Sequence, residues 1–135
     1  MARSKHNNDS HRFYTWLNSA QEDLLAAQIL MSNFKCYNLA AFHCQQTLEK
    51  ILKAYILFKN NRLYDGHNLL WLCKQAAKLD DTFFCFLDAC AKMNHFYIEA
   101  RYPSDLFLEI TKEDIKELVI DTKSIFDKIC MKMYI

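Results

Sequence analysis

The sequence predicts an all-α protein, an up-and-down antiparallel bundle of four to five helices. The chain of 135 residues holds one Gly and one Pro, far below the average usage of about 7% and 5%. So few turn residues leave little with which to connect the strands of a sheet. Apolar residues make up 52% of the chain, enough to close one core at this length without disulfides or metal.

The first half of the chain contains two helical patterns followed by turn residues. Apolar residues recur at helical spacing over residues 13–33, and Gln21, Glu22 and Asp23 are expected on or near the opposite face. A second helix over residues 38–60 is apolar around most of its circumference, so we expect it at the centre. Turn residues follow, and a third helix is expected to begin near His67.

The second half contains two further helices separated by an irregular link. Residues 80–82 offer N-cap oxygens for a fourth helix that extends through Tyr97. Pro103 prevents easy continuation of this helix. Residues 98–110 are therefore expected to be irregular, and the whole is expected to comprise four long helices and one shorter helix.

The last helix is expected to begin after Thr111 and to end with the chain. Thr111 is followed three residues later by Asp114, a weak form of the capping box. At the other end, residues 1–12 are polar and lack periodicity, so they are interpreted as a mobile tail. The expected organisation is this tail and one helical domain over residues 13–135.

Charge and cysteine content exclude several classes of protein. Seventeen basic and sixteen acidic residues give a net charge of +1, without the general basic character that drives nonspecific nucleic-acid binding. The six cysteines show no C-x-x-C spacing, which argues against structural zinc. No signal peptide or membrane span is evident, so we expect a cytoplasmic protein with reduced thiols.

A polar stripe on the second helix is the first candidate site. His43, Gln46, Glu49, Lys50 and Lys53 recur at steps of three and four on an otherwise apolar helix. Burying such charges is costly unless they meet partners, a water-filled groove or a ligand. The alternative is that Glu49 and the two lysines form a solvated edge and pair with each other.

The irregular link supplies a second set of candidates, over residues 101–105. Arg101 presents a planar fork suited to phosphate or carboxylate, and Tyr102 could stack on a base. The alternative is that Arg101 caps a helix C-terminus or pairs with Glu99 or Glu49.

Other chemistries receive little support from the sequence. His67 follows the single glycine, where its imidazole could bind a ligand or cap and pack the third helix. No His, Asp, Glu or Cys set has metal-ligand spacing, so we expect no metal and no cofactor. Catalysis by a cysteine nucleophile with a histidine partner stays open, although the sequence singles out no cysteine for it. One glycine cannot build a P-loop or a dinucleotide-binding fold.

Four segments in order resemble the HEPN domain family. They are residues 16–24, residues 42–54, His67-Asn-Leu69 and Arg101-Tyr102-Pro103, and the resemblance covers about residues 13–129. It implies a four- or five-helix bundle, a homodimer, and association with nucleotides or RNA. It also implies a possible partner, a minimal nucleotidyltransferase, in a pair of the toxin–antitoxin kind.

The chain departs from the ribonuclease branch of that family. Those members place a His about four to six residues after the Arg, whereas Leu106, Phe107 and Leu108 follow Arg101 here, and none can act as a general acid or base. The resemblance is therefore to the branch in which a polar groove is expected to bind nucleotide. The resemblance therefore implies that the nucleotide-binding residues of this chain are Gln46, Glu49, Lys50, Lys53, His67, Arg101, Tyr102 and Asp105.

The leading hypothesis is a noncatalytic homodimer that binds nucleotide or nucleic-acid phosphate in this groove. One alternative is a divergent, metal-independent ribonuclease in which His95 or His67 acts with Arg101. Another is a pure protein-interaction module, in which the same stripe meets a partner helix. Catalysis is not expected, but the sequence leaves it open.

Overall fold

The structure, a computed structural model, describes residues 8–94 and 110–134, and every regular element in that part is helical. The elements are α1 (Phe13–Leu30), a 3₁₀ helix (Phe34–Cys36), α2 (Tyr37–Asn60), α3 (Leu69–Ala77), a 3₁₀ helix (Asp81–Phe86), α4 (Leu87–Asn94) and α6 (Lys112–Met133). The expected all-α class is confirmed. Of the described α-helices, α1, α2 and α6 are long and α3 is short. Helix α4 reaches Asn94, the last described residue before the gap, so the expectation of a fourth long helix stays a prediction.

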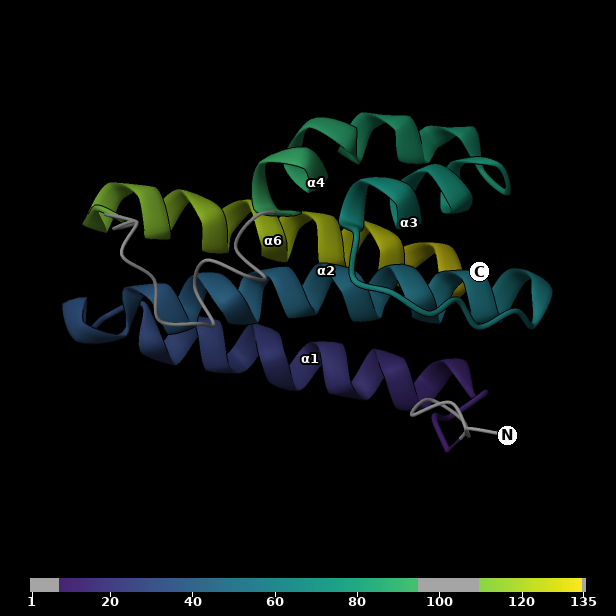
Figure 1. Cartoon of the computed structure of the whole chain (residues 1–135), viewed down its shortest axis with the longest axis horizontal. Helices are drawn as coiled ribbons and strands as arrows, with labels where there is room; N and C mark the ends of the chain where they lie inside the picture. Colours follow the sequence, from purple (N-terminus) through teal and green to yellow (C-terminus); the bar gives the residue numbers. More distant parts are fainter. Residues whose placement is uncertain (1–7, 95–109, 135) are drawn as a thin grey trace, which may run out of the picture.

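The central helix is α2, as the sequence predicts. It packs against α1, α3, α4 and α6, and most of its side chains are buried, including Leu48, Ile51 and Ile56. Each such side chain contributes about 1.5–3 kcal/mol through burial of apolar surface. Figure 1 shows α1 beside α2 and running in the opposite direction. Ala20 and Ala27 of α1 are fully buried, and their small size allows the two helices to approach closely.

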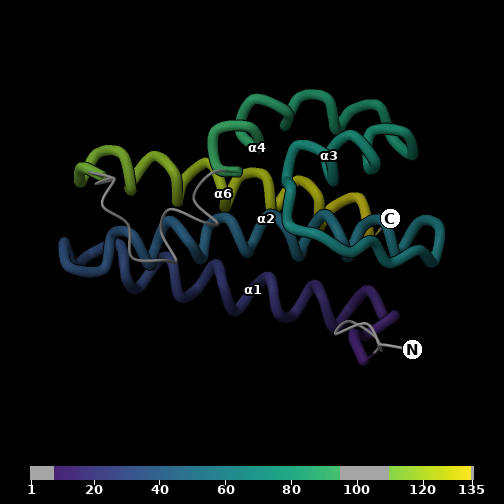
Figure 2. The backbone as a smooth tube through the Cα atoms, viewed as in Figure 1, coloured from purple at the N-terminus to yellow at the C-terminus, as the bar shows by residue number. Residues whose placement is uncertain are grey.

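The C-terminal helix α6 completes the core. Its buried stripe includes Ile115, Leu118 and Ile129, and it runs in the same direction as α2 (Figure 2). The side chain of Thr111 accepts from the backbone of Asp114, and that of Asp114 accepts from the backbone of Thr111. The predicted capping box is therefore confirmed, and it fixes where α6 begins.

The connection between α2 and α3 is an extended segment, residues 61–68, that runs back along α2 (Figure 1). Asn61 ends α2 in the left-handed region with φ of 57°, and this turn reverses the chain. Helix α3 begins at Leu69 because the Asn68 side chain caps it by accepting from the backbone of Trp71. His67 is thus left in the connection, beside α2.

The expected fourth helix is divided. Asp80 caps it, as predicted, but its first six residues, Asp81–Phe86, form a 3₁₀ helix before α4 begins. This tighter turn places Phe83 in the core, where its ring lies 4.5 Å from that of Tyr55. The expected end of the helix at Tyr97 and most of the irregular link lie outside the described residues. In the described part, no helix has the length and apolar character needed to cross a membrane.

Candidate functional site

A carboxylate at the centre of α2, that of Glu49, bridges a lysine and a histidine. Its Oε2 lies 3.2 Å from Nζ of Lys53, one turn along the helix, and its Oε1 lies 2.9 Å from Nδ1 of His67. The side chains of Glu49 and Lys53 are each 4% exposed, whereas that of His67 is 34% exposed. Burial of either charge alone would be costly, so each of the two charges depends on the other as its partner.

A second carboxylate, that of Asp23 on α1, bridges another histidine and another lysine. Its Oδ1 lies 2.9 Å from Nδ1 of His43, and its Oδ2 lies 2.8 Å from Nζ of Lys50. Lys50 also donates to the hydroxyl of Ser19, at 2.9 Å. These contacts join α1 to α2 across a largely buried polar seam.

Two glutamines extend the network on α2. Buried Gln45 donates to Glu49 over 3.5 Å and to the backbone carbonyl of His67 over 3.2 Å. Gln46 donates to the side-chain oxygen of Gln45 over 2.7 Å. The connection of residues 61–68 is therefore held to α2 at His67 through both its side chain and its backbone.

The aromatic ring of Trp16 covers the buried end of this network. Nζ of Lys53 lies 5.3 Å from the centre of that ring, within the range of a cation–π interaction. The indole nitrogen of Trp16 donates to the carbonyl of Ser10 over 2.7 Å. The ammonium of Lys53 is thus enclosed between a carboxylate and an aromatic face.

The network is electrically balanced. Its two carboxylates, of Asp23 and Glu49, match the two ammonium groups, of Lys50 and Lys53, so it carries no net charge when both imidazoles are neutral. Its most exposed ionisable side chains are those of His43, Lys50 and His67, at 27%, 23% and 34%. Protonation of the imidazoles would make this edge positive.

Five of the predicted site residues lie in or beside this network: Gln46, Glu49, Lys50, Lys53 and His67. The alternative expectation was a solvated edge in which Glu49 and the two lysines pair with each other. Glu49 and Lys53 do pair, but they are buried and not solvated, and Lys50 pairs with Asp23 of α1. Arg101, Tyr102 and Asp105, as well as His95 and Glu99, lie outside the described residues.

The sequence reasoning missed the residues that pair with the predicted ones. Asp23, 12% exposed, was expected on or near the outer face of the first helix, and this placement is wrong. It adjoins buried Leu24 and lies three residues after buried Ala20, a spacing that places it at the border of the buried face. Gln45 and Ser19 gave no comparable signal in the sequence.

Metal binding and thiol chemistry are two further kinds of chemistry that the described residues can be searched for. Among the described residues, no group of three or more His, Cys, Asp or Glu side chains is arranged to hold a metal ion. All six cysteines are free. Burial raises the pKa of Cys44 and of Cys130 to about 11, and the hydrogen bond with Cys73, together with burial, raises the pKa of Cys90. These three thiols therefore form little thiolate.

Comparison with known proteins identifies the family. The family model of the HEPN domain matches residues 13–133, nearly the whole chain. The protein belongs to the HEPN domain family. No curated protein is significantly similar to this HEPN chain in sequence.

Two solved structures share the fold of this HEPN domain. TT1696 from Thermus thermophilus superposes with a TM-score of 0.80 at 24% identity, over 91% of this chain and 99% of that one. ST0689, an archaeal HEPN homologue, superposes with a TM-score of 0.71 at 24% identity, over 90% of this chain and 98% of that one. At this identity the similarity establishes the helical architecture.

Proposed function

We propose that this HEPN protein binds the phosphate groups of a nucleotide or nucleic acid at the exposed edge of the charged network, and that it does so without catalysis. The observation that carries the proposal is the pair of bridging carboxylates, each of which orients one histidine and one lysine. The ligand-facing groups are His43, Lys50 and His67, with Arg101, Tyr102 and Asp105 as further candidates on the chain.

The geometry favours binding over a purely structural role for these partly exposed side chains. Asp23 and Glu49 each hold an imidazole through Nδ1 at 2.9 Å, which fixes the orientation of the ring. Charge-assisted N–H donors of fixed orientation are suited to phosphate oxygens. The buried pair of Glu49 and Lys53 then supports the site from beneath and does not itself meet the ligand.

The experiment that tests this proposal is isothermal titration with ATP and then GTP. Parent protein should show saturable binding, and Lys50→Met or His67→Gln should weaken it by about ten- to a hundredfold, the range expected for one lost charged contact. Lys74→Met is the control, since Lys74 is an exposed lysine on α3 that lies outside the charged network. Circular dichroism would check that each variant is folded.

Two results would contradict the proposal. One is flat heats with both nucleotides. The other is saturable binding that persists unchanged in folded Lys50→Met and His67→Gln proteins. In the second case the ligand site would lie elsewhere on the chain.

A second candidate function, metal-independent RNA cleavage, is favoured by one observation. A carboxylate within hydrogen-bonding distance of an imidazole, as in Glu49 and His67 at 2.9 Å, is the arrangement that orients a general acid or base. Cleavage of structured RNA in the presence of a chelator, abolished by both Arg101→Ala and His67→Gln, would support this function. Absence of cleavage by the parent protein would exclude it under those conditions.

We further propose that the protein is a homodimer, acts in the cytoplasm, and pairs with a minimal nucleotidyltransferase in a toxin–antitoxin-like system. The family resemblance supports the dimer and the partner, and the six free cysteines suit a reducing compartment. Light scattering of the purified protein would test the dimer. Copurification with the product of the neighbouring reading frame, and the identity of that product, would test the partner.

A further inference from the structure

A groove separate from the charged network lies between the 3₁₀ helix Asp81–Phe86 and the C-terminal half of α6. Its volume is about 410 Å³. Its lining residues are Thr82, Cys85, Phe86, Lys128, Met131 and Lys132. We name it the lysine-rimmed groove, because its surface is largely apolar and two of its side chains end in ammonium groups.

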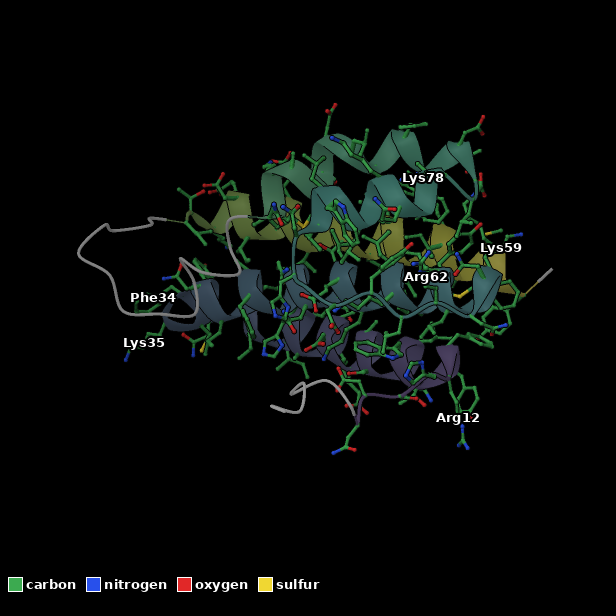
Figure 3. All side chains as sticks on the ribbon, turned by 45° about the vertical axis from the view of Figure 1, so that its right-hand side comes forward. Arg12, Phe34, Lys35, Lys59, Arg62 and Lys78 are labelled. Carbon is green, nitrogen blue, oxygen red and sulfur yellow. The ribbon has the colours of Figure 1, made fainter. Side chains whose placement is uncertain are left out.

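A second hollow adjoins this groove and shares Lys132 with it. It measures about 440 Å³ and is lined by Tyr55, Phe58, Lys59, Asp80 and Lys132. Figure 3 shows Lys59 and Lys78 toward the end of the molecule opposite Phe34 and Lys35. The two hollows therefore form one extended surface at the end of the bundle where α2 and α6 end.

This surface is positively charged. The two hollows contain three lysines and one aspartate, and Asp80 already pairs with Lys132 at 3.0 Å. In the described part of the chain, neither Lys59 nor Lys128 has an ion pair. The ammonium groups of Lys59 and Lys128 thus lie at the edges of an apolar surface, and no carboxylate of the described residues pairs with them.

Large apolar side chains are exposed on the two elements that form the groove, and one of them, Met131, lines it. Met131 and Tyr134 at the end of α6 are each 70% exposed, and Phe84 of the 3₁₀ helix is 58% exposed. Apolar groups gathered at a rimmed hollow are typical of a protein contact surface. Met is particularly suited to such a surface, because its flexible side chain adapts to different partners.

We propose that the lysine-rimmed groove binds an acidic amphipathic segment of a partner protein. An apolar anchor of that segment fills the space beside Phe86 and Met131, and its carboxylates face Lys59 and Lys128. The groove is open, whereas small-molecule sites enclose most of their ligand. A nucleic-acid surface would need basic side chains along its length and stacking platforms, and the floor here is apolar.

The proposal is independent of nucleotide binding, since none of the groove residues belongs to the charged network. The probe is a fluorescein-labelled helical peptide of about 16 residues, with Leu and Phe on one face and Glu on the other. A scrambled peptide of identical composition and an analogue with Lys in place of Glu are the peptide controls. Fluorescence anisotropy measures affinity, and alkylation of exposed Cys85 by iodoacetamide reports occupancy of the groove.

The expected result is saturable binding of the acidic amphipathic peptide and slower alkylation of Cys85. Lys128→Glu should weaken binding at least about tenfold, because it replaces an attractive contact by a repulsive one. Lys116→Glu, an equal charge change at an exposed position near the start of α6, should leave the affinity unchanged. The scrambled and Lys-substituted peptides should bind at least about tenfold more weakly.

Three results would overturn the proposal. The first is equal weakening by Lys128→Glu and Lys116→Glu, which would indicate nonspecific attraction of charge. The second is peptide binding without protection of Cys85. The third is protection of Cys85 by dodecanoate but not by the peptide, which would make the groove a site for a small anionic amphiphile.

Discussion

The Glu49 carboxylate lies 2.9 Å from Nδ1 of His67, a residue 18 positions later in the chain. This contact joins the centre of α2 to the extended connection that follows it. The same carboxylate lies 3.2 Å from the buried ammonium of Lys53. Glu49 therefore balances a buried charge and fixes the path of the connection, and it orients the histidine at the edge of the candidate site.

Glu49→Ala should destabilise the protein strongly. Removal of this 4% exposed carboxylate leaves the Lys53 ammonium buried and unmatched, which costs about 3–5 kcal/mol. Urea unfolding followed by circular dichroism measures the effect. Glu117→Ala, at a 64% exposed position on α6, is the control and should change the free energy of unfolding by less than about 0.5 kcal/mol. Equal values for the two variants would contradict the role of Glu49.

The pair of Glu49 and Lys53 should be strongly coupled in a double-mutant cycle. Glu49→Gln and Lys53→Met each leave one buried charge unmatched, whereas the double variant removes both. The double variant should therefore lose less stability than the sum of the two single losses, by about 1–3 kcal/mol. Additive losses would mean that the two charges are solvated independently, in conflict with their burial.

The helical architecture could be predicted from the sequence because it follows from periodicity and caps. The apolar stripe of α6 and the Thr111 and Asp114 capping box are local patterns, so both were found. The division of the expected fourth helix could not be predicted in this way. The 3₁₀ start occurs together with burial of Phe83 against Tyr55, a contact between residues distant in sequence that local patterns do not encode.

Part of the candidate site could also be predicted from the sequence, because that part depends on a local pattern. Glu49 and Lys53 lie one helical turn apart, so their pairing follows from spacing on α2 alone. The partners of Lys50 and of Glu49, namely Asp23 and His67, come from other segments. Their positions depend on the packing of α1 and on the reversal of the chain at Asn61, which no local pattern encodes.

Asp80 should contribute stability that is lost in acid. Hydrogen bonds from Thr82 and the ammonium of Lys132 lower the pKa of Asp80 from 3.8 to about 2. Because the pKa is lower in the folded state, this stabilisation is present above about pH 4 and is lost as the pH falls through about 2. Solvent screening at this partly exposed position limits it to roughly 1 kcal/mol.

Asp80→Asn isolates this contribution, since Asn retains the oxygen that caps the 3₁₀ helix. The variant should be less stable than the parent by roughly 1 kcal/mol at neutral pH, and the difference should vanish near pH 2. Urea unfolding of both proteins between neutral pH and about pH 2 measures this difference in the free energy of unfolding. Asp81→Asn is the control and should change stability by less than about 0.5 kcal/mol at neutral pH. A difference for Asp80→Asn that is constant with pH would refute the assignment.

Thr111→Ala should weaken the start of α6. The Thr111 hydroxyl accepts from the backbone of Asp114 at 3.1 Å, and loss of this N-cap costs about 1 kcal/mol. Thr111→Ser keeps the hydroxyl and should remain within about 0.5 kcal/mol of the parent. Thermal unfolding compares the two variants. If Ser and Ala were equally destabilising, the methyl group and not the cap would be responsible.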